Sequence, residues 1–168
     1  MNAPIGAPPH QDLDLDRLLG MAPPELEALY LAAQVPNLAA VAGDLRGRML
    51  APVGVPGPVR ALARMAARAS WFPWKGKTFR PTDAERGEGD NRVISQRWHW
   101  YRFTTFIGQS KAGPFQALHL NYDHPENPGF IRAIEDEVRE VRPGLLLGQA
   151  WFVTRKRARL VLWFALEY

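Results

Sequence analysis

Alternating apolar and polar positions dominate the chain from Trp74 to its end. FQALHLNYD (115–123) alternates along its length, and LVLWFALEY (160–168) is apolar on both faces. A two-residue period, interrupted by Pro, Gly and charged turns, is typical of consecutive β-strands. We predict strands at 43–51, 74–79, 93–108, 115–123, 135–141, 145–154 and 160–168, with 93–108 forming either one long bent strand or two paired strands.

Two segments near the N-terminus have helical spacing instead. Segment 23–34 opens with prolines and acids, as the first turn of a helix requires, and then repeats apolar residues three and four apart. Segment 59–70 has an arginine face and an apolar face, formed by Arg60, Arg64 and Arg68 and by Leu62, Met65, Ala66 and Ala69. The apolar face is mostly alanine, so its burial would be weakly driven, and we expect this second helix to dock across one end of the barrel.

The remaining segments are expected to be irregular. Residues 1–11 read as a disordered tail and 12–19 as a short acidic lead into ordered structure. Residues 80–92 are so polar and Gly-rich that we predict a mobile loop. Residues 129–141 also fit helical spacing, but the Arg-Pro-Gly turn that follows favours a helical turn at 129–133 and then a hairpin.

These elements predict a single α+β, mainly β domain over 12–168. Its helical part covers about 12–70, and its β part covers about 43–51 and 71–168. So many half-apolar strands in meander order are best buried by a sheet that curls on itself. We therefore predict a meandering antiparallel, lipocalin-like barrel or strongly curled sheet preceded by two helices.

Composition narrows the class of protein. A chain of 168 residues without cysteine excludes disulfide scaffolds, thiolate metal sites and cysteine nucleophiles. The first residues lack the basic and apolar regions of an export signal, and no apolar run approaches the length that spans a bilayer, so we expect a cytoplasmic protein. The net charge of +4 is a weak indication of a polyanionic partner.

Histidines and carboxylates gather around residues 119–126. His119 shares a strand face with Asp123, but four residues of strand separate them by about 13 Å, too far for direct contact. The polar face of that strand could line a wet cavity, although exposure to solvent is the favoured interpretation. His124 and Glu126 have no third ligand at suitable spacing, so no metal is expected. Asp123 in Tyr-Asp-x-Pro is interpreted as a turn starter.

Several short motifs together resemble those of small bacterial lipocalin-like (calycin-type) barrel proteins, which are related to G-x-W-x-G-signature domains. The resemblance covers about residues 43–168 and rests on Trp74-Lys75-Gly76-Lys77-x-Phe79, Tyr122-Asp123-x-Pro125 with Pro128, Asp136-Glu137-Val138-Arg139-x-Val141, and Leu147-Gly148. The chain has no leading G-x-W-x-G. The resemblance implies a barrel whose cavity holds a small hydrophobic or amphipathic molecule. Similar haem-binding barrels use a histidine near the C-terminus, which this chain lacks, and no cofactor is expected.

Two functions fit such a cavity. A binding protein would use aromatic walls and a few polar contacts, here Trp98, Trp100, Trp151, Trp163, Tyr101, Arg102, His119, Tyr122 and Arg132. An isomerase or cyclase would use Asp123, Asp136 or Glu137 as general base, with His119 or Tyr101 as donor. A solvated hairpin face is the favoured interpretation of 135–137, and the alternative places Asp136 or Glu137 at the barrel mouth, facing inward against Arg102 or Arg132. An inward carboxylate within reach of a donor would favour catalysis.

Surface binding is the third possibility. The arginine helix could lie on an anionic membrane, and Lys75, Lys77 and Arg80 with the basic tip at 154–159 could contact nucleic acid. No nucleic-acid-binding motif is present, so neither partner is favoured. A terminal strand that is apolar on both faces also allows a homodimer.

Overall fold

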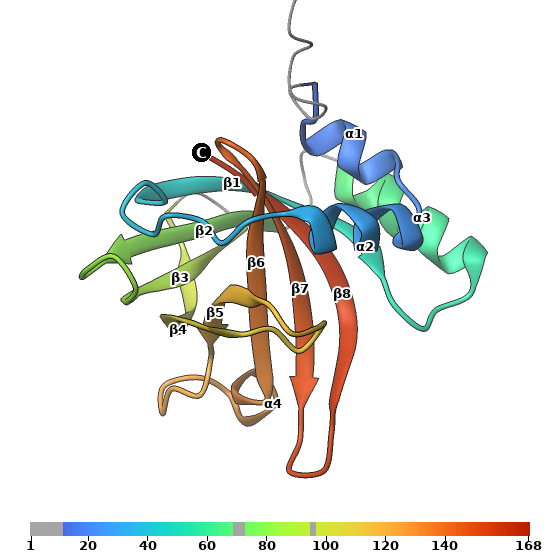
Figure 1. Cartoon of the computed structure of the whole chain (residues 1–168). Helices are drawn as coiled ribbons and strands as arrows, with labels where there is room; N and C mark the ends of the chain where they lie inside the picture. The colour runs from blue at the N-terminus through green and yellow to red at the C-terminus, as the bar shows by residue number, and fades with distance from the viewer. Residues whose placement is uncertain (1–11, 69–72, 95–96) are drawn as a thin grey trace, which may run out of the picture.

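The strands form a closed barrel in a computed structural model that describes residues 12–68, 73–94 and 97–168 (Figure 1). Within these residues each strand pairs antiparallel with the next, and β8 returns to pair with β1. The strands are β1 (Gly43–Pro52), β2 (Trp74–Pro81), β3 (Gly87–Val93), β4 (His99–Gln109), β5 (Gln116–Asn121), β6 (Ile134–Arg142), β7 (Leu145–Val153) and β8 (Ala158–Glu167). The helices are α1 (Leu15–Gly20), α2 (Pro23–Ala32), α3 (Gly57–Arg68) and α4 (Gly129–Arg132).

This architecture confirms the predicted class, α+β and mainly β, and the barrel form of the sheet. It also explains why β8 is apolar on both faces. Phe164 and Leu166 belong to the core inside the barrel, whereas Trp163 and Ala165 belong to a second core outside it. The second core lies under the N-terminal helices, which cover this face of the terminal strand.

Helices α1 and α2 cover the outside of the barrel at β6, β7, β8 and β1. Leu18, Leu26 and Tyr30 are fully buried there, and the Tyr30 ring meets the edge of Trp163 at 5.7 Å. The sequence pattern missed α1, which was expected to be only a lead-in. Its six residues are too few for periodicity to show, but Asp14 caps the helix by accepting a hydrogen bond from the Arg17 amide.

One end of the barrel is filled. Leu45, Phe79, Phe103 and Leu120 point into it, and the Phe79 and Phe103 rings pack edge to face. Leu38 and Val41, from the segment between α2 and β1, are buried in the same cluster and close this end. Any internal cavity must therefore lie toward the opposite end, where β1 ends and β2 begins.

The prediction of a mobile loop at 80–92 is wrong for most of its length, because Arg80 and Pro81 end β2 and residues 87–93 form β3 in the barrel wall. Residues 82–86 are the exposed connection between these two strands. Three of the polar side chains that suggested a loop, those of Asp90, Asn91 and Arg92, are buried. Asp90 pairs with Arg80 at 2.7 Å, and Asn91 accepts a hydrogen bond from Lys77 at 2.8 Å. Gly89 is required by packing, since a Cβ there would lie 2.4 Å from the Phe103 ring.

Other predicted elements are largely confirmed. In the segment predicted as a strand at 93–108, the part from His99 onward is β4, and Val93 is the last residue of β3. This arrangement is closer to the predicted alternative of two paired strands. The helical turn α4 and the β6–β7 hairpin are present, and Gly144 in the hairpin turn has a φ of +83°. Across the described ranges, no helix has the length and apolar character to cross a membrane.

Helix α3 is also present and contacts β1, but the large side chains of its expected apolar face are exposed. Leu62 and Met65 are 67% and 69% exposed. The side chains of Arg60, Arg64 and Arg68 lie outside the described structure, as do residues 1–11 and 69–72.

Candidate functional site

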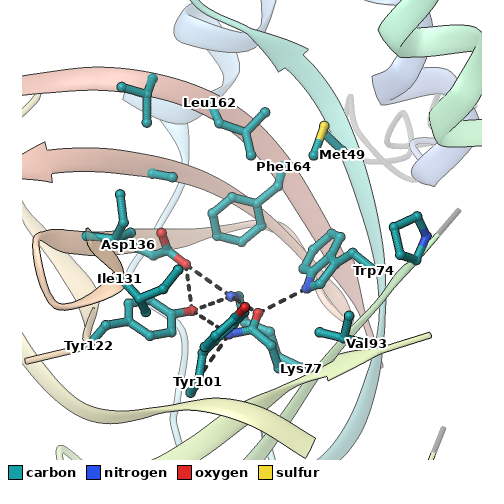
Figure 2. A pocket seen from close by; sticks show the side chains of 15 residues that line it. Met49, Trp74, Lys77, Val93, Tyr101, Tyr122, Ile131, Asp136, Leu162 and Phe164 are labelled. Carbon is teal, nitrogen blue, oxygen red and sulfur yellow. Dashed lines mark hydrogen bonds and ion pairs between the residues drawn. The ribbon is translucent and has the colours of Figure 1, made fainter. Parts of the chain in front are cut away.

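The open half of the barrel encloses a cavity of about 390 Å³ (Figure 2). Its walls are largely apolar and come from strands on all sides of the barrel, including Met49, Trp74, Val93, Ile134, Leu162 and Phe164. Pro73 is exposed, and Tyr101 and Ile131 are half-buried, so the cavity reaches the surface on the side of α4. A volume of this size is at the lower end of the range for small-molecule sites in proteins.

Four polar side chains meet inside this cavity. Lys77 Nζ lies 3.0 Å from Asp136 Oδ2 and donates to Asn91 Oδ1 at 2.8 Å and to the Tyr122 hydroxyl. Tyr122 in turn donates to Asp136 Oδ2 at 2.9 Å, and Asn91 Nδ2 donates to the Tyr122 oxygen at 3.2 Å (Figure 2). We call Lys77, Asn91, Tyr122 and Asp136 the lumen cluster. It forms a closed hydrogen-bond network with one positive and one negative charge.

A β-bulge in β2 aims Lys77 into the barrel. The register with β3 shifts by one residue between Trp74 and Gly76, so that both Trp74 and Lys77 point inward. Gly76 has a φ of +133°, a conformation that residues with a Cβ rarely adopt. A Cβ at Gly76 would lie 2.0 Å from the Leu45 carbonyl oxygen, so the close approach of β1 and β2 also requires glycine.

Burial controls the ionisation of the lumen cluster. Burial lowers the pKa of Lys77, and the nearby Asp136 carboxylate partly offsets this by favouring the ammonium. The rings of Trp74 and Phe164 lie 5.4 and 5.2 Å from Nζ and also favour the cation. Burial, followed by the charge of Asp136, raises the pKa of Tyr122 well above its ordinary value, so its hydroxyl remains a donor.

A second polar cluster lies on the outer wall of the barrel. His119 is buried, stacks on Phe106 at 4.7 Å, and places Nδ1 2.7 Å from Glu135 Oε1. Glu137 is fully buried and accepts hydrogen bonds from the Ser110 hydroxyl at 2.6 Å and the Lys111 amide at 2.9 Å.

His119, Glu135 and Glu137 could in principle offer ligand atoms to a metal, since these atoms lie within 4.8 Å of one another. The Lys111 ammonium, however, already pairs with both carboxylates. The cluster is thus a polar clamp in which one ammonium bridges two carboxylates and joins β5, β6 and the β4–β5 turn.

Because the Glu135 carboxylate is part of this clamp, the free energy of unfolding should depend on pH. Burial raises the pKa of Glu135, but hydrogen bonds from His119 and Lys111 outweigh it and hold the pKa below its usual value. A lowered carboxyl pKa stabilises the fold above the unfolded-state pKa of about 4.3, and this stability is lost as pH falls through the folded-state pKa. Glu135→Gln should therefore cost about 1–2 kcal/mol at neutral pH and progressively less in acid, measured by urea unfolding.

The exposed Glu126→Gln variant is the matched control, with an expected change within about 0.5 kcal/mol. A cost of Glu135→Gln that stayed the same from neutral pH to about pH 3 would contradict the assigned role of the carboxylate.

The three carboxylates that the sequence suggested as general bases lie in three different places in the structure. Asp136 faces the cavity, but its cationic partner is Lys77 rather than Arg102 or Arg132. Glu137 and His119 lie on the outer wall, so the expectation that His119 faces solvent or a wet cavity is wrong. Asp123 lies in the corner after β5.

The two arginines expected at the barrel mouth lie elsewhere. Arg132 donates to the Asp123 carboxylate at 2.7 Å, and the turn residue is Asn121 instead, whose Oδ1 accepts from the Asp123 amide at 2.7 Å. Arg102 is partly exposed and pairs with Glu88 and Glu126 at 3.3 and 3.4 Å.

The tryptophans predicted as cavity walls lie elsewhere. Trp98 and Trp100 are 51% and 42% exposed and pack on each other at the surface. Trp163 is buried against Tyr30 outside the barrel, and Trp151 is half-buried without lining the cavity. The predicted Tyr101 and Tyr122 do line it.

Trp74, Lys77 and Asn91 were missed as site residues. The sequence did contain a signal for Lys77, because strand alternation places it on the same face as Phe79, which is buried. Asn91 carried no comparable signal, because its segment read as a loop.

Comparison with known proteins supports the fold. No protein-family model and no curated protein matches the chain. A crystal structure of a protein from Thermomonospora curvata is similar, with a TM-score of 0.57 and 15% sequence identity over 91% of this chain and 94% of that chain. At this identity the likeness shows the fold alone, and it fits a calycin-like barrel.

Proposed function

We propose that the protein binds one small, neutral amphipathic molecule in the barrel cavity, as lipocalin-like carriers do. The observation that supports this is the cavity itself, about 390 Å³ of apolar wall with one concentrated polar cluster. Apolar walls supply affinity, and a few convergent polar groups fix orientation. The apolar part of the ligand would lie against Met49, Leu162 and Phe164, and its polar group would meet the lumen cluster.

The charge of the lumen cluster favours a neutral ligand. Lys77 and Asp136 cancel each other at 3.0 Å, and Tyr122 and Asn91 carry no charge at neutral pH. An anionic head group would lose its hydration beside the Asp136 carboxylate without a free cation to pair with, which is costly in an apolar site. A hydroxyl, carbonyl or amide group can instead exchange hydrogen bonds with Tyr122 and Asn91.

Fluorescence titration with prodan, a neutral dye whose emission shifts to the blue in apolar sites, tests this proposal. The wild-type chain should bind one prodan molecule, and 1-decanol should displace it at least about ten-fold more effectively than decanoate. Ala150→Phe places a ring in the cavity from its wall and should weaken prodan binding by about ten-fold or more.

The control is Ala158→Phe, at an exposed position where β8 begins. It should bind prodan like the wild type. Equal binding by the wild type and by a folded Ala150→Phe variant would place the dye outside the barrel and refute the proposal.

Catalysis in the same cavity is the second candidate, as an isomerase or cyclase. The observation in its favour is that Asp136 Oδ2 faces the cavity within 2.9 Å of Tyr122 and 3.0 Å of Lys77. Asp136 would remove a proton from the ligand, and Tyr122 would stabilise the developing negative charge. Chemical conversion of the bound ligand on incubation with the wild type, but not with Asp136→Asn, would favour this function over simple binding.

A further inference from the structure

We infer that Lys77 Nζ condenses with the carbonyl carbon of an aldehyde or ketone held in the cavity and forms an imine with it. The inference rests on the proposed binding function and narrows its ligand class from neutral amphiphiles to carbonyl compounds. Lys77 lines the cavity and is only 3% exposed. The other lysines of the chain, Lys75, Lys111 and Lys156, do not line it.

A proton acceptor is already in place. An ammonium must lose a proton before it can attack a carbonyl carbon, and Asp136 Oδ2 lies 3.0 Å from Nζ. Burial disfavours the ammonium of Lys77 relative to the neutral amine, and this effect grows when a ligand excludes water from the site. The Tyr122 hydroxyl, 2.9 Å from the same carboxylate oxygen, can donate to the carbonyl oxygen of the ligand.

The reaction balances without an oxidant or reductant. Lys77 transfers one proton to Asp136, its lone pair forms the N–C bond, and the C=O π electrons move to oxygen, which takes the proton from Asp136. A second nitrogen proton passes through Asp136 to that hydroxyl. The C–O bond then breaks, water leaves, and the nitrogen lone pair completes the C=N bond. The product is a protonated imine whose charge replaces that of the ammonium beside Asp136.

The hydrogen-bond network can accommodate this product. The protonated imine keeps one N–H, which can remain directed at Asp136, and gives up the hydrogen bonds to Asn91 and Tyr122. Neither acceptor is left without a donor. Asn91 Oδ1 still accepts from Trp74 Nε1 at 3.0 Å, and the Tyr122 oxygen still accepts from Asn91 Nδ2 at 3.2 Å. Condensation therefore leaves both of these buried acceptors with a partner.

The test is reductive trapping of the full chain with decanal and sodium cyanoborohydride, followed by mass spectrometry of the lysine-containing peptides. Cyanoborohydride reduces the protonated imine to a stable secondary amine, which adds one decyl group to the lysine. We expect Lys77 to be modified at least about ten-fold faster than Lys156 of the exposed hairpin tip, with 1-decanol suppressing only the Lys77 reaction.

Two variants separate this inference from the proposed function. Lys77→Arg keeps a cation beside Asp136 and should abolish the fast, 1-decanol-sensitive decylation while leaving the slow decylation of Lys156 unchanged. Ala150→Phe should lose prodan binding and Lys77 labelling together. If decanal displaces prodan from the wild type yet labels Lys77 no faster than Lys156, the imine is refuted and the binding function stands. If neither decanal nor prodan binds, the imine and the binding function are both refuted.

Discussion

Asp136→Leu is expected to lower the free energy of unfolding by about 3–5 kcal/mol. The change leaves the Lys77 ammonium, whose side chain is 4% exposed, in an apolar cavity without its carboxylate partner. It also removes the acceptor of the Tyr122 hydroxyl. Because both groups are buried, water can replace the lost partner only if it enters the barrel. Urea unfolding followed by tryptophan fluorescence measures the loss.

The double variant Lys77→Met/Asp136→Leu separates the cost of an unpaired charge from the value of the pair. It replaces both charges with apolar groups and should recover most of the stability lost in Asp136→Leu. A double variant as unstable as the single one would show that the cost comes from altered packing. A change below about 1 kcal/mol in the single variant would show that Lys77 is not held as a buried ammonium.

Gly76→Ala is expected to cost about 3 kcal/mol or more, because two separate penalties combine. The φ of +133° strains any residue with a Cβ, and that Cβ would lie 2.0 Å from the Leu45 carbonyl oxygen and 2.7 Å from the Gly47 nitrogen. Both contacts are with the backbone of β1, so relief requires β1 and β2 to separate. The bulge that directs Lys77 into the cavity should be lost with them, and thermal unfolding measures the effect.

Gly20→Ala, at the end of α1, is the control for this prediction. A Cβ there would have no atom within 4 Å, and alanine favours helix, so stability should stay the same or rise by up to about 1 kcal/mol. A Gly76→Ala variant that melts like the wild type and still binds prodan would contradict the requirement for glycine in the bulge.

Most of the barrel could be predicted from the sequence because most of its strands obey simple periodicity. FQALHLNYD places Leu118, Leu120 and Tyr122 on one face, and this face is the inside of the barrel. β3 could not be predicted in this way. Its buried side chains are polar and satisfy one another across strands, so nothing in GEGDNR distinguishes a buried network from a solvated loop.

The candidate site was predictable only in part. Tyr122 follows from strand alternation, Asp136 and Tyr101 were named among the candidates, and all three line the cavity. Trp98 and Trp100 were expected as walls because aromatic residues are usually buried, yet they lie outside the barrel. Which aromatic residues point inward depends on bulges such as the one between Trp74 and Gly76, and a bulge reverses the alternation without a clear sequence signal.

The lumen cluster also shows why function depends on tertiary contacts. The lumen cluster comes from β2, β3, β6 and the residue that follows β5, and only closure of the barrel brings these side chains together. No local motif encodes this arrangement. A lysine in a strand that otherwise contributes buried residues is the feature most useful for finding similar sites in other sequences.

Native mass spectrometry of the wild type and Ala150→Phe, both purified from the protein's own host, tests the central claim most directly. The account predicts one small neutral molecule bound per wild-type chain, identified after solvent extraction, and none bound to Ala150→Phe. A wild-type chain that is empty while nucleic acid or anionic lipid co-purifies with both proteins would contradict the account and move the function to the outer surface.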